Sequence, residues 1–264
     1  MTAWLRFEQA GRSGFGVLEA DTVHVYDGDL FLGCAPTGER LPLGELTLTL
    51  PCVPSKLLGL SNNYRALAAK QGSAIPAEPF YFIKGANSYL AHGKSLRAPR
   101  SYTGRVVYEG ELGVVIGRRA YEVDLAQAEA CIFGYTCVND VTALDLILGE
   151  PALAQWTRAK SFDGFGAFGP VISTGLDGSA LTVRTLVNGR ERQNYPTSDM
   201  IFSPAQLVSL LSRELTLEPG DLITCGTSLG VGVLKPETTV EVAIDGIGVL
   251  RNPVVRGKSA LGLA

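Results

Sequence analysis

The sequence predicts an α+β protein that is mainly β, with a few helices flanking the strands. Candidate strands outnumber candidate helices along the 264 residues, and the two do not alternate with the regular βαβ period of a doubly wound sheet. Glycine accounts for 31 residues, well above its usual share of about 7%. Because tight turns need backbone angles that glycine adopts without strain, this excess favours a turn-rich β architecture.

Residues 1–55 predict a small N-terminal domain, a meander of β-hairpins. The short β-like segments WLRFEQ, GFGVLEA and TVHVYDG are separated by glycine-rich turns, and the pattern ends at the prolines of LPCVPSK. A segment of this size buries little apolar surface alone, so we expect it to pack on the rest of the chain.

The next elements alternate between strands and short helices. KLLGL predicts a strand, followed by a helix that opens at Ser61 or Asn62 and then the strand PFYFIKG. Residues 85–104 are loop-like. VVYEGELGVVIG then predicts one strand, DLAQAEACI a helix, FGYTCVNDV a strand and TALDLILGE a helix.

The last third is again rich in strands. GPVIST and LTVRTLVNG predict strands, and SPAQLVSLLSREL predicts a helix with Ser203 as its cap and Pro204 at its first position. DLITCG, TVEVAI and GVLRNPVV complete the strands. The main domain is therefore expected to cover residues 56–255, with residues 256–264 as a loose tail.

Charge and apolar patterning exclude several partners. Lys and Arg total 23 against 26 Asp and Glu, so the chain lacks the basic field that binding nucleic acid requires. No signal-peptide pattern opens the sequence and no stretch of about 18 apolar residues occurs, which favours a cytoplasmic protein without a membrane partner. The five cysteines show no CxxC spacing and predict buried, reduced thiols.

Familiar nucleotide and hydrolase motifs are absent from the sequence. GRSGFG precedes a strand instead of a helix, and GTSLGVG lacks the Lys-Ser/Thr of a phosphate loop. The chain has only two histidines, His24 and His92, and no G-x-S-x-G segment. We therefore expect neither a nucleotide site nor a Ser-His-Asp triad.

Three acidic residues form the most informative pattern. Glu109 and Glu111 are two residues apart in a predicted strand, which places their side chains on the same face about 7 Å apart. Asp140 ends another apolar strand. Without a functional role, the two glutamates would lie on a solvated strand face and Asp140 would be a helix N-cap. Three carboxylates brought together would instead suit a hard cation such as Mg²⁺ or Mn²⁺.

Lys160 lies in the polar and aromatic segment QWTRAKSFDGFG. It is either a surface charge or the cation that holds a substrate oxyanion beside the metal.

These segments resemble the fumarylacetoacetate hydrolase superfamily from about Lys56 to Val255. The matching text is SNNYRALAAKQG, PFYFIKG, YEGELGVVIG, GYTCVNDVTALD, QWTRAKSFDGFGAFGP, VNGRERQNYPTSDMIF and LEPGDLITCGTSLGVG. The N-terminal meander is similar to the appendage of some bacterial members. The resemblance implies a mixed β-roll or sandwich of the family's C-terminal type with flanking helices, usually as a homodimer.

The resemblance also implies a site and a chemistry. Glu109, Glu111 and Asp140 match the family's ligands for Mg²⁺, Mn²⁺ or Ca²⁺, and Lys160 and Asp140 match its catalytic positions. Thr227, in the turn after Gly226, matches the threonine that contacts the substrate carboxylate or oxo group. The family's substrates are small 2-oxo or 1,3-dicarbonyl acids, whose carbonyl a divalent cation polarises so that an enolate is stabilised. Further expected substrate-binding positions in the matching text are Tyr64, Leu67, Lys84, Leu144, Ile147, Gln193 and Gly226.

Two departures from the family pattern alter the expected pocket. Hydrolytic members carry N-Y-x-x-H-x-x-E, whose His and Glu activate water, but Leu67 and Lys70 stand at those positions here. The family's T-A-R-D-x-Q has Leu144 and Ile147 in place of Arg and Gln. We expect a less polar pocket and a lost or replaced water activation. His92 is either a substitute base or an ordinary loop histidine.

The sequence thus indicates a metal-dependent enzyme that acts on 2-oxo or 1,3-dicarbonyl acids in catabolism, such as late aromatic degradation. The resemblance favours carbon–carbon hydrolysis of the acylpyruvate type. The missing dyad supports an alternative, an isomerase, tautomerase or decarboxylase of 2-hydroxydiene dioates or oxaloacetate. A metal-binding protein with decayed catalysis is a second alternative. Gly110, between the two glutamates, further predicts a close backbone approach behind the metal.

Overall fold

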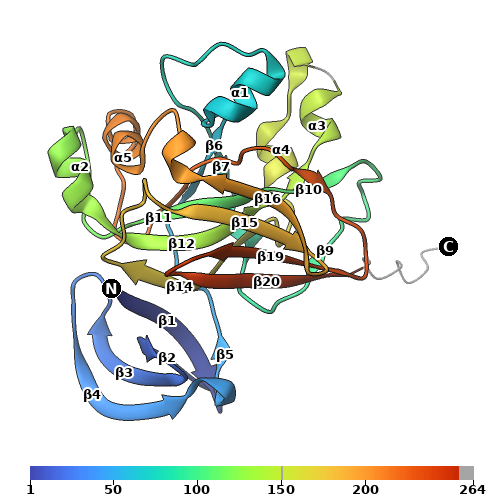
Figure 1. Cartoon of the computed structure of the whole chain (residues 1–264). Helices are drawn as coiled ribbons and strands as arrows, with labels where there is room; N and C mark the ends of the chain where they lie inside the picture. Colours follow the sequence, from blue (N-terminus) through green and yellow to red (C-terminus); the bar gives the residue numbers. More distant parts are fainter. Residues whose placement is uncertain (150, 256–264) are drawn as a thin grey trace.

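One long mixed sheet begins in the N-terminal strands and runs through the body of the molecule (Figure 1). The computed structural model describes residues 1–149 and 151–255. Strands dominate these residues and helices flank the sheets, so the predicted mainly β, α+β class is confirmed. The tail that was expected to be loose, residues 256–264, lies outside the described residues.

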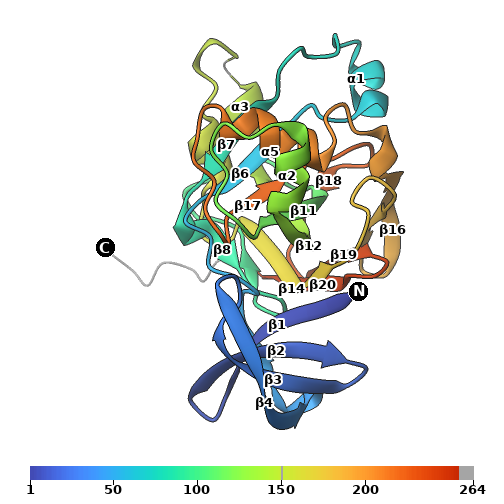
Figure 2. The same cartoon turned by 90° about the vertical axis from the view of Figure 1, so that its left-hand side faces the viewer.

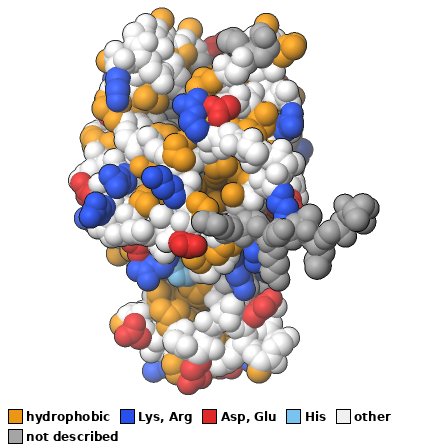
Figure 3. All heavy atoms as spheres, turned by 90° about the vertical axis from the view of Figure 1, so that its right-hand side faces the viewer, with side chains coloured by type: hydrophobic (Ala, Val, Ile, Leu, Met, Phe, Trp, Pro, Cys, Tyr) orange, Lys and Arg blue, Asp and Glu red, His pale blue; other side chains and the backbone are white. Residues whose placement is uncertain are grey.

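Four antiparallel strands form the N-terminal meander, as the hairpin pattern predicts. They are β1 (Thr2–Gln9), β2 (Arg12–Glu19), β3 (Thr22–Asp29) and β4 (Gly33–Pro42). The meander is not a separate sheet, because β1 pairs with β2 on one side and with β14 (Gly166–Thr174) on the other. Ala3 lies opposite Ser173 across that junction. The meander forms a smaller lobe below the main body, with hydrophobic side chains visible where the two meet (Figure 3).

Beyond β14 the long sheet continues through strands that are neighbours in space but not in sequence. In spatial order they are β12 (Ile132–Asp140), β11 (Gly110–Ile116), β17 (Leu222–Thr224), β6 (Leu57–Ser61) and β7 (Phe80–Lys84). The short strands β5 (Thr47–Leu48) and β8 (Tyr89–Leu90) pair with β1 and β14 respectively.

A five-stranded sheet packs against the long sheet and encloses the main core. Its strands, in order, are β16 (Arg190–Pro196), β15 (Thr182–Val187), β19 (Thr238–Ile244), β20 (Gly248–Val255) and β9 (Leu96–Arg97). Val114 and Cys137 of the long sheet belong to the same buried cluster as Val183 and Val242 of this sheet. A small third sheet consists of β13 (Thr142–Ala143), β10 (Val106–Tyr108) and β18 (Gly232–Val233).

Strand β11 shows why the segment GELGVVI is apolar on both faces. Leu112, Val114 and Ile116 point into the cluster between the sheets, whereas Val115 belongs to a second cluster on the opposite face. Successive side chains of a strand alternate faces, so a strand covered on both sides needs an unbroken apolar run. All seven residues of β11 are buried.

In the described part of the chain, five short α-helices flank the sheets. They are α1 (Arg65–Gln71), α2 (Leu125–Cys131), α3 (Asp145–Leu148), α4 (Trp156–Lys160) and α5 (Pro204–Ser212). The 3-10 turns are η1 (Leu43–Glu45), η2 (Ala86–Ser88), η3 (Pro151–Leu153) and η4 (Thr197–Asp199). Helices α2 and α5 lie together at the left of Figure 1 and face the viewer in Figure 2, whereas α1 and α3 lie at the top of Figure 1 with α4 below them. No helix in the described ranges has the length and apolar character needed to cross a membrane.

The predicted start of α5 is confirmed. The Ser203 hydroxyl accepts a hydrogen bond from the Gln206 backbone N–H, the Gln206 side chain reciprocates, and Pro204 occupies the first turn. This capping box satisfies two backbone donors that the helix leaves free.

The segment VVYEGELGVVIG forms two strands rather than the single predicted strand. β10 pairs with β13 and β18, whereas β11 pairs with β12 and β17. The chain therefore passes from one sheet to another at Glu109, and a single strand cannot serve both sets of partners.

Helix α1 begins at Arg65, so the predicted opening at Ser61 or Asn62 is wrong. Strand β6 extends through Ser61, and Asn62 adopts a left-handed backbone with φ of 57°. The Asn63 amide then donates to the carbonyls of Phe202 and Cys225, which fixes this turn before the helix can start.

The segment after Asp140 also differs from the prediction. Thr142–Ala143 pairs with β10 as strand β13, and the remaining helix α3 is short and has Leu144 as its N-cap. Asp140 is therefore not a helix cap.

Candidate active site

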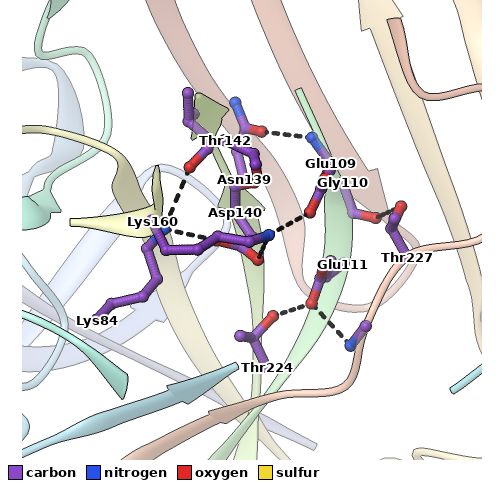
Figure 4. Close-up of polar contacts among 12 residues, drawn as sticks. Lys84, Glu109, Gly110, Glu111, Asn139, Asp140, Thr142, Lys160, Thr224 and Thr227 are labelled. Atoms are coloured by element: carbon purple, nitrogen blue, oxygen red, sulfur yellow. Dashed lines mark hydrogen bonds and ion pairs between the residues drawn. The ribbon is translucent and has the colours of Figure 1, made fainter. Parts of the chain in front are cut away.

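Three carboxylates converge where the strands β10, β11 and β12 meet (Figure 4). Glu109 occupies the break between β10 and β11, Glu111 lies on β11, and Asp140 is the last residue of β12. β11 and β12 are paired with Gly110 opposite Asn139, which brings the three side chains to one place. One carboxylate oxygen from each lies within 4.8 Å of the others.

Two lysines neutralise part of this charge. Lys160 Nζ, at the end of α4, donates to Glu109 Oε2 at 2.7 Å and to Asp140 Oδ2 at 2.5 Å. Lys84 Nζ, at the end of β7, donates to Asp140 Oδ1 at 2.5 Å and to the Val141 carbonyl at 3.3 Å. With all five groups ionised, the cluster carries one net negative charge.

Burial and the lysines shift these ionisations in different directions. Burial alone would raise the pKa of Asp140, but Lys160 and Lys84 together lower it. Burial raises the pKa of Glu111 well above its ordinary value, and the nearby charges of Asp140 and Glu109 add to the effect. The pKa of Lys84 is lowered because its ammonium is fully buried.

Glu111 has one satisfied oxygen and one free oxygen. Its Oε2 accepts from the Thr224 hydroxyl and, at 2.8 Å, from the Gly226 backbone N–H. Its Oε1 is buried without a hydrogen-bond partner. A buried carboxylate oxygen without a partner is costly unless a cation binds it. Three converging carboxylates, a free buried oxygen and a net negative charge fit a hard divalent cation.

The turn after β17 and the backbone of Gly110 are tied together by hydrogen bonds. Thr227 Oγ1 donates to the Gly110 carbonyl at 3.1 Å and accepts from Gln193 Nε2 at 2.8 Å. Gln193 Oε1 in turn accepts from the Gly110 N–H at 3.0 Å. Gly226 supplies the positive φ, 86°, that this turn requires.

The close backbone approach predicted at Gly110 is present. A Cβ at this position would lie 1.9 Å from Oγ1 of Thr185, on the facing sheet. Only glycine lets β11 and β15 approach this closely.

A cavity of about 350 Å³ opens above the cluster. Six residues named from the sequence line it: Leu67, Glu109, Leu144, Ile147, Lys160 and Thr227. The sequence reasoning missed eight others: Leu60, Ser61, Asn62, Gln71, Thr142, Leu148, Trp156 and Val231. Gln71 lies one helical turn after Leu67, so the i, i+4 spacing on α1 could have indicated it.

The other sequence-predicted positions lie behind the cavity wall. Lys84 reaches Asp140 from β7, and Gln193 and Gly226 support Thr227 and Glu111. Tyr64 is fully buried, with its ring edge-to-face on Tyr195 at a centroid distance of 4.9 Å.

His92 lies at a different place. Its Nδ1 accepts from the Arg251 backbone N–H at 3.2 Å, in a hollow lined by Leu43, Thr47 and their neighbours. It takes no part in lining the cavity above the carboxylates.

Fold and site together define a mainly β protein with a carboxylate site for a cation beneath a small-molecule cavity. Residues 56–255 match the family described as fumarylacetoacetate (FAA) hydrolase C-terminal, and residues 3–51 match the domain described as Rv2993c-like, N-terminal. The chain belongs to the fumarylacetoacetate hydrolase family, so the resemblance stated from the sequence is confirmed.

Similar proteins have names that span several reactions. Oxaloacetate tautomerase YisK from Bacillus subtilis is 38% identical over 226 residues, which are 80% of this chain and 74% of the relative. The structure of 2-hydroxyhepta-2,4-diene-1,7-dioate isomerase from Mycobacterium marinum is 35% identical with a TM-score of 0.89, covering 98% of this chain and 100% of that one. Fumarylacetoacetate hydrolase from Exiguobacterium antarcticum is 31% identical with a TM-score of 0.84, covering 97% and 100%. Members of the family are thus enzymes, and divalent metals are typical of them.

Proposed function

We propose that this protein is a divalent-metal-dependent isomerase or tautomerase that interconverts keto and enol forms of a small 2-oxo acid. The proposal rests on the contrast between the charged floor and the apolar wall of one cavity. Its floor presents Lys160 beside the carboxylates, whereas its wall is apolar at Leu67, where hydrolytic relatives carry a histidine. The names of the tautomerase and isomerase relatives support the same reaction class.

Glu109, Glu111 and Asp140 would hold Mg²⁺ or Mn²⁺, with Ca²⁺ as a further candidate. When bound, such a cation polarises the 2-oxo carbonyl as a Lewis acid.

Lys160 would supply the second positive group. Its ammonium has three donors, of which two are used by Glu109 and Asp140. The third is free to hold a proton beside the substrate oxygen on which negative charge develops. Because its pKa is raised by Asp140 and Glu109 despite the opposing effect of burial, Lys160 stays protonated at neutral pH.

Thr227 would orient the substrate, and residues behind it would hold the site rigid. Gln193 fixes the Thr227 hydroxyl, and Lys84 fixes Asp140 from the side away from the cavity. We assign Lys84 to positioning Asp140 rather than to contacting substrate, because its side chain is fully buried.

Carbon–carbon hydrolysis would need an activated water, and the described cavity lining offers no histidine for this step. Its one carboxylate, Glu109, is paired with Lys160. Lys70, which replaces the family glutamate, is exposed on α1. A keto–enol interconversion moves only a proton and needs no such water.

The proposal is tested by incubating the purified protein with enol oxaloacetate and with an acylpyruvate, in Mg²⁺, Mn²⁺, Ca²⁺ or EDTA. We expect metal-dependent acceleration of tautomerisation over the protein-free control by ultraviolet absorbance, and no cleavage or decarboxylation beyond that control by NMR. Lys160→Met should abolish the activity, and Lys94→Met, at an exposed position, should retain it. Products of hydrolysis or decarboxylation would instead support those reactions, and no turnover with any metal would support a decayed site.

The role of the missing dyad is tested by restoring it. Leu67→His combined with Lys70→Glu places an acid and a base on one face of α1 at i, i+3. We expect acylpyruvate hydrolysis to appear in the double variant and not in Lys70→Glu alone. No gain would contradict this explanation. The expected homodimer is part of the proposal, and light scattering measures it.

A further inference from the structure

We propose that the substrate has a single carboxylate and an uncharged, largely apolar tail, so that dicarboxylic 2-oxo acids bind poorly. This inference rests on the proposed function and names the substrate class of the same cavity. It departs from the dioate and the oxaloacetate in the names of two relatives.

The cavity wall away from the carboxylates is mainly apolar. Leu67 contributes from α1, Leu144 and Ile147 from the start and middle of α3, and Val231 from the loop before β18. The Trp156 indole is held against Phe82, with ring centroids 5.5 Å apart and planes at 25°, so it presents a fixed surface. The remaining lining groups in this region, such as Gln71, are neutral.

The charge of the site is balanced by one carboxylate. The three acids and two lysines leave one net negative charge, and a divalent cation would turn this into one net positive charge. The carboxylate of a 2-oxo acid neutralises it. A second carboxylate would be desolvated without a partner, which is strongly unfavourable in a confined apolar cavity.

No other cation among the described lining residues is free to receive a second carboxylate. Lys160 is the one cationic side chain on the described wall, and it is engaged by Glu109 and Asp140. Arg105, outside the lining, is paired with Asp145 of α3 at 2.5 Å. A neutral tail therefore matches the wall, and a charged tail does not.

Binding of two inert ligands of similar size tests the inference. N-Propyl oxamate and N-oxalylglycine share the 2-oxo acid head and differ in whether the tail ends in a methyl or a carboxylate group. Calorimetry with the Mn²⁺-loaded protein should show at least about tenfold tighter binding of the propyl compound. Equal or tighter binding of N-oxalylglycine would overturn the inference.

A kinetic comparison separates failure of this inference from failure of the proposed function. The kcat/KM of tautomerisation should be at least about tenfold higher for the 4-methyl ester of oxaloacetate than for oxaloacetate itself. Turnover that favours oxaloacetate overturns the tail preference and leaves the reaction standing. Preference for the propyl ligand without turnover of any 2-oxo acid supports the tail preference and overturns the reaction.

A cation added to the wall should reverse the preference. Leu148 lines the cavity and is 56% exposed, so Leu148→Arg is compatible with folding. It should tighten N-oxalylglycine binding about tenfold, whereas Leu153→Arg, at a 71% exposed position off the wall, should leave it unchanged. Val231→Lys, from the opposite loop, provides a second test. If both wall variants fold and neither improves binding of the dicarboxylate, the inference is wrong.

Discussion

Asp140 receives an ammonium group on each of its two carboxylate oxygens, and both lysines are almost fully buried. Removing Lys84 would leave the buried carboxylate with Lys160 alone. We expect Lys84→Met to lower the free energy of unfolding by about 3–5 kcal/mol, the usual cost of breaking a buried pair. Urea denaturation measures this loss. Lys94→Met serves as the exposed control, and a cost for Lys84→Met no greater than for this control would contradict the buried-pair explanation.

We expect the substitution Glu111→Gln to have opposite effects on the stability of the metal-free protein and on metal binding. Because burial raises its pKa, the folded metal-free protein binds a proton more tightly than the unfolded chain does. This stabilising contribution is present at low pH and declines as the pH rises above about 4.3, the unfolded value, towards the raised folded pKa. Glu111→Gln cannot ionise, so its stability relative to wild type should increase with pH. Urea denaturation in EDTA between about pH 5 and pH 8 tests this, and a pH-independent difference is the contrary result.

The same substitution should abolish tight binding of Mn²⁺. Gln retains an oxygen for the bonds from Thr224 and Gly226 but loses the negative charge. Because burial raises the pKa of Glu111, a proton competes with the metal for its carboxylate in the wild type, so Mn²⁺ binding should tighten as the pH rises. Calorimetry in buffers of different ionisation enthalpy measures both effects. Unchanged Mn²⁺ affinity in Glu111→Gln would count against this residue as a ligand.

The residue types of the site could be predicted from the sequence, but some of their partners could not. Glu109, Glu111 and Asp140 occupy short segments whose strand pattern is clear in isolation. Lys84 ends an ordinary apolar strand, and its partner lies 56 residues further along the chain. Sequence spacing contains no information about that contact, because it arises only when β7 and β12 are placed in one sheet.

At the scale of elements, the site depends on the break between β10 and β11. The sequence VVYEGELGVVIG predicts one strand because its apolar pattern continues on both sides of Glu109. The two halves become separate strands because each pairs with a different distant segment, β10 with β18 and β11 with β12. The start of helix α1 differs from its prediction for a similar reason, since long-range hydrogen bonds of Asn63 determine it.

Gly110 provides a test of this packing. In Gly110→Ala the new Cβ would overlap Thr185 Oγ1, so β11 or β15 must shift. We expect a loss of about 2 kcal/mol or more in the free energy of unfolding. Gly44→Ala, where nothing lies within 4 Å of the added Cβ, should change it by less than about 0.5 kcal/mol. Thr185→Ala in the Gly110→Ala background should recover part of the loss, and a lack of recovery would argue against this contact.

At the scale of the whole molecule, the N-terminal strands and the body share one sheet through β1 and β14. Leu5 and Phe7 of β1 also belong to the main buried cluster. The sequence predicted the meander and its packing, but not the continuous sheet, because strand edges cannot be matched across about 170 residues without the fold. We propose that residues 1–55 and 56–255 unfold together.

Ala3→Pro tests this coupling, because β1 has partners on both sides and proline cannot donate to a ladder. We expect a loss of about 3 kcal/mol and a lower Tm for one transition of the whole chain in calorimetry. Ala35→Pro, in the outermost strand β4, should have a much smaller effect. Two separate transitions, with the second unaffected by Ala3→Pro, would show independent units.

The position of Lys160 between Glu109 and Asp140 has a consequence for how the protein matures. An internal counter-ion lets the acidic strands assemble before any metal is acquired, so folding and metal loading can be separate events. The newly made chain would then fold into a stable, metal-free protein that is inactive until it binds a metal ion. Its activity would follow the supply of divalent ions in its surroundings rather than the rate of its own synthesis.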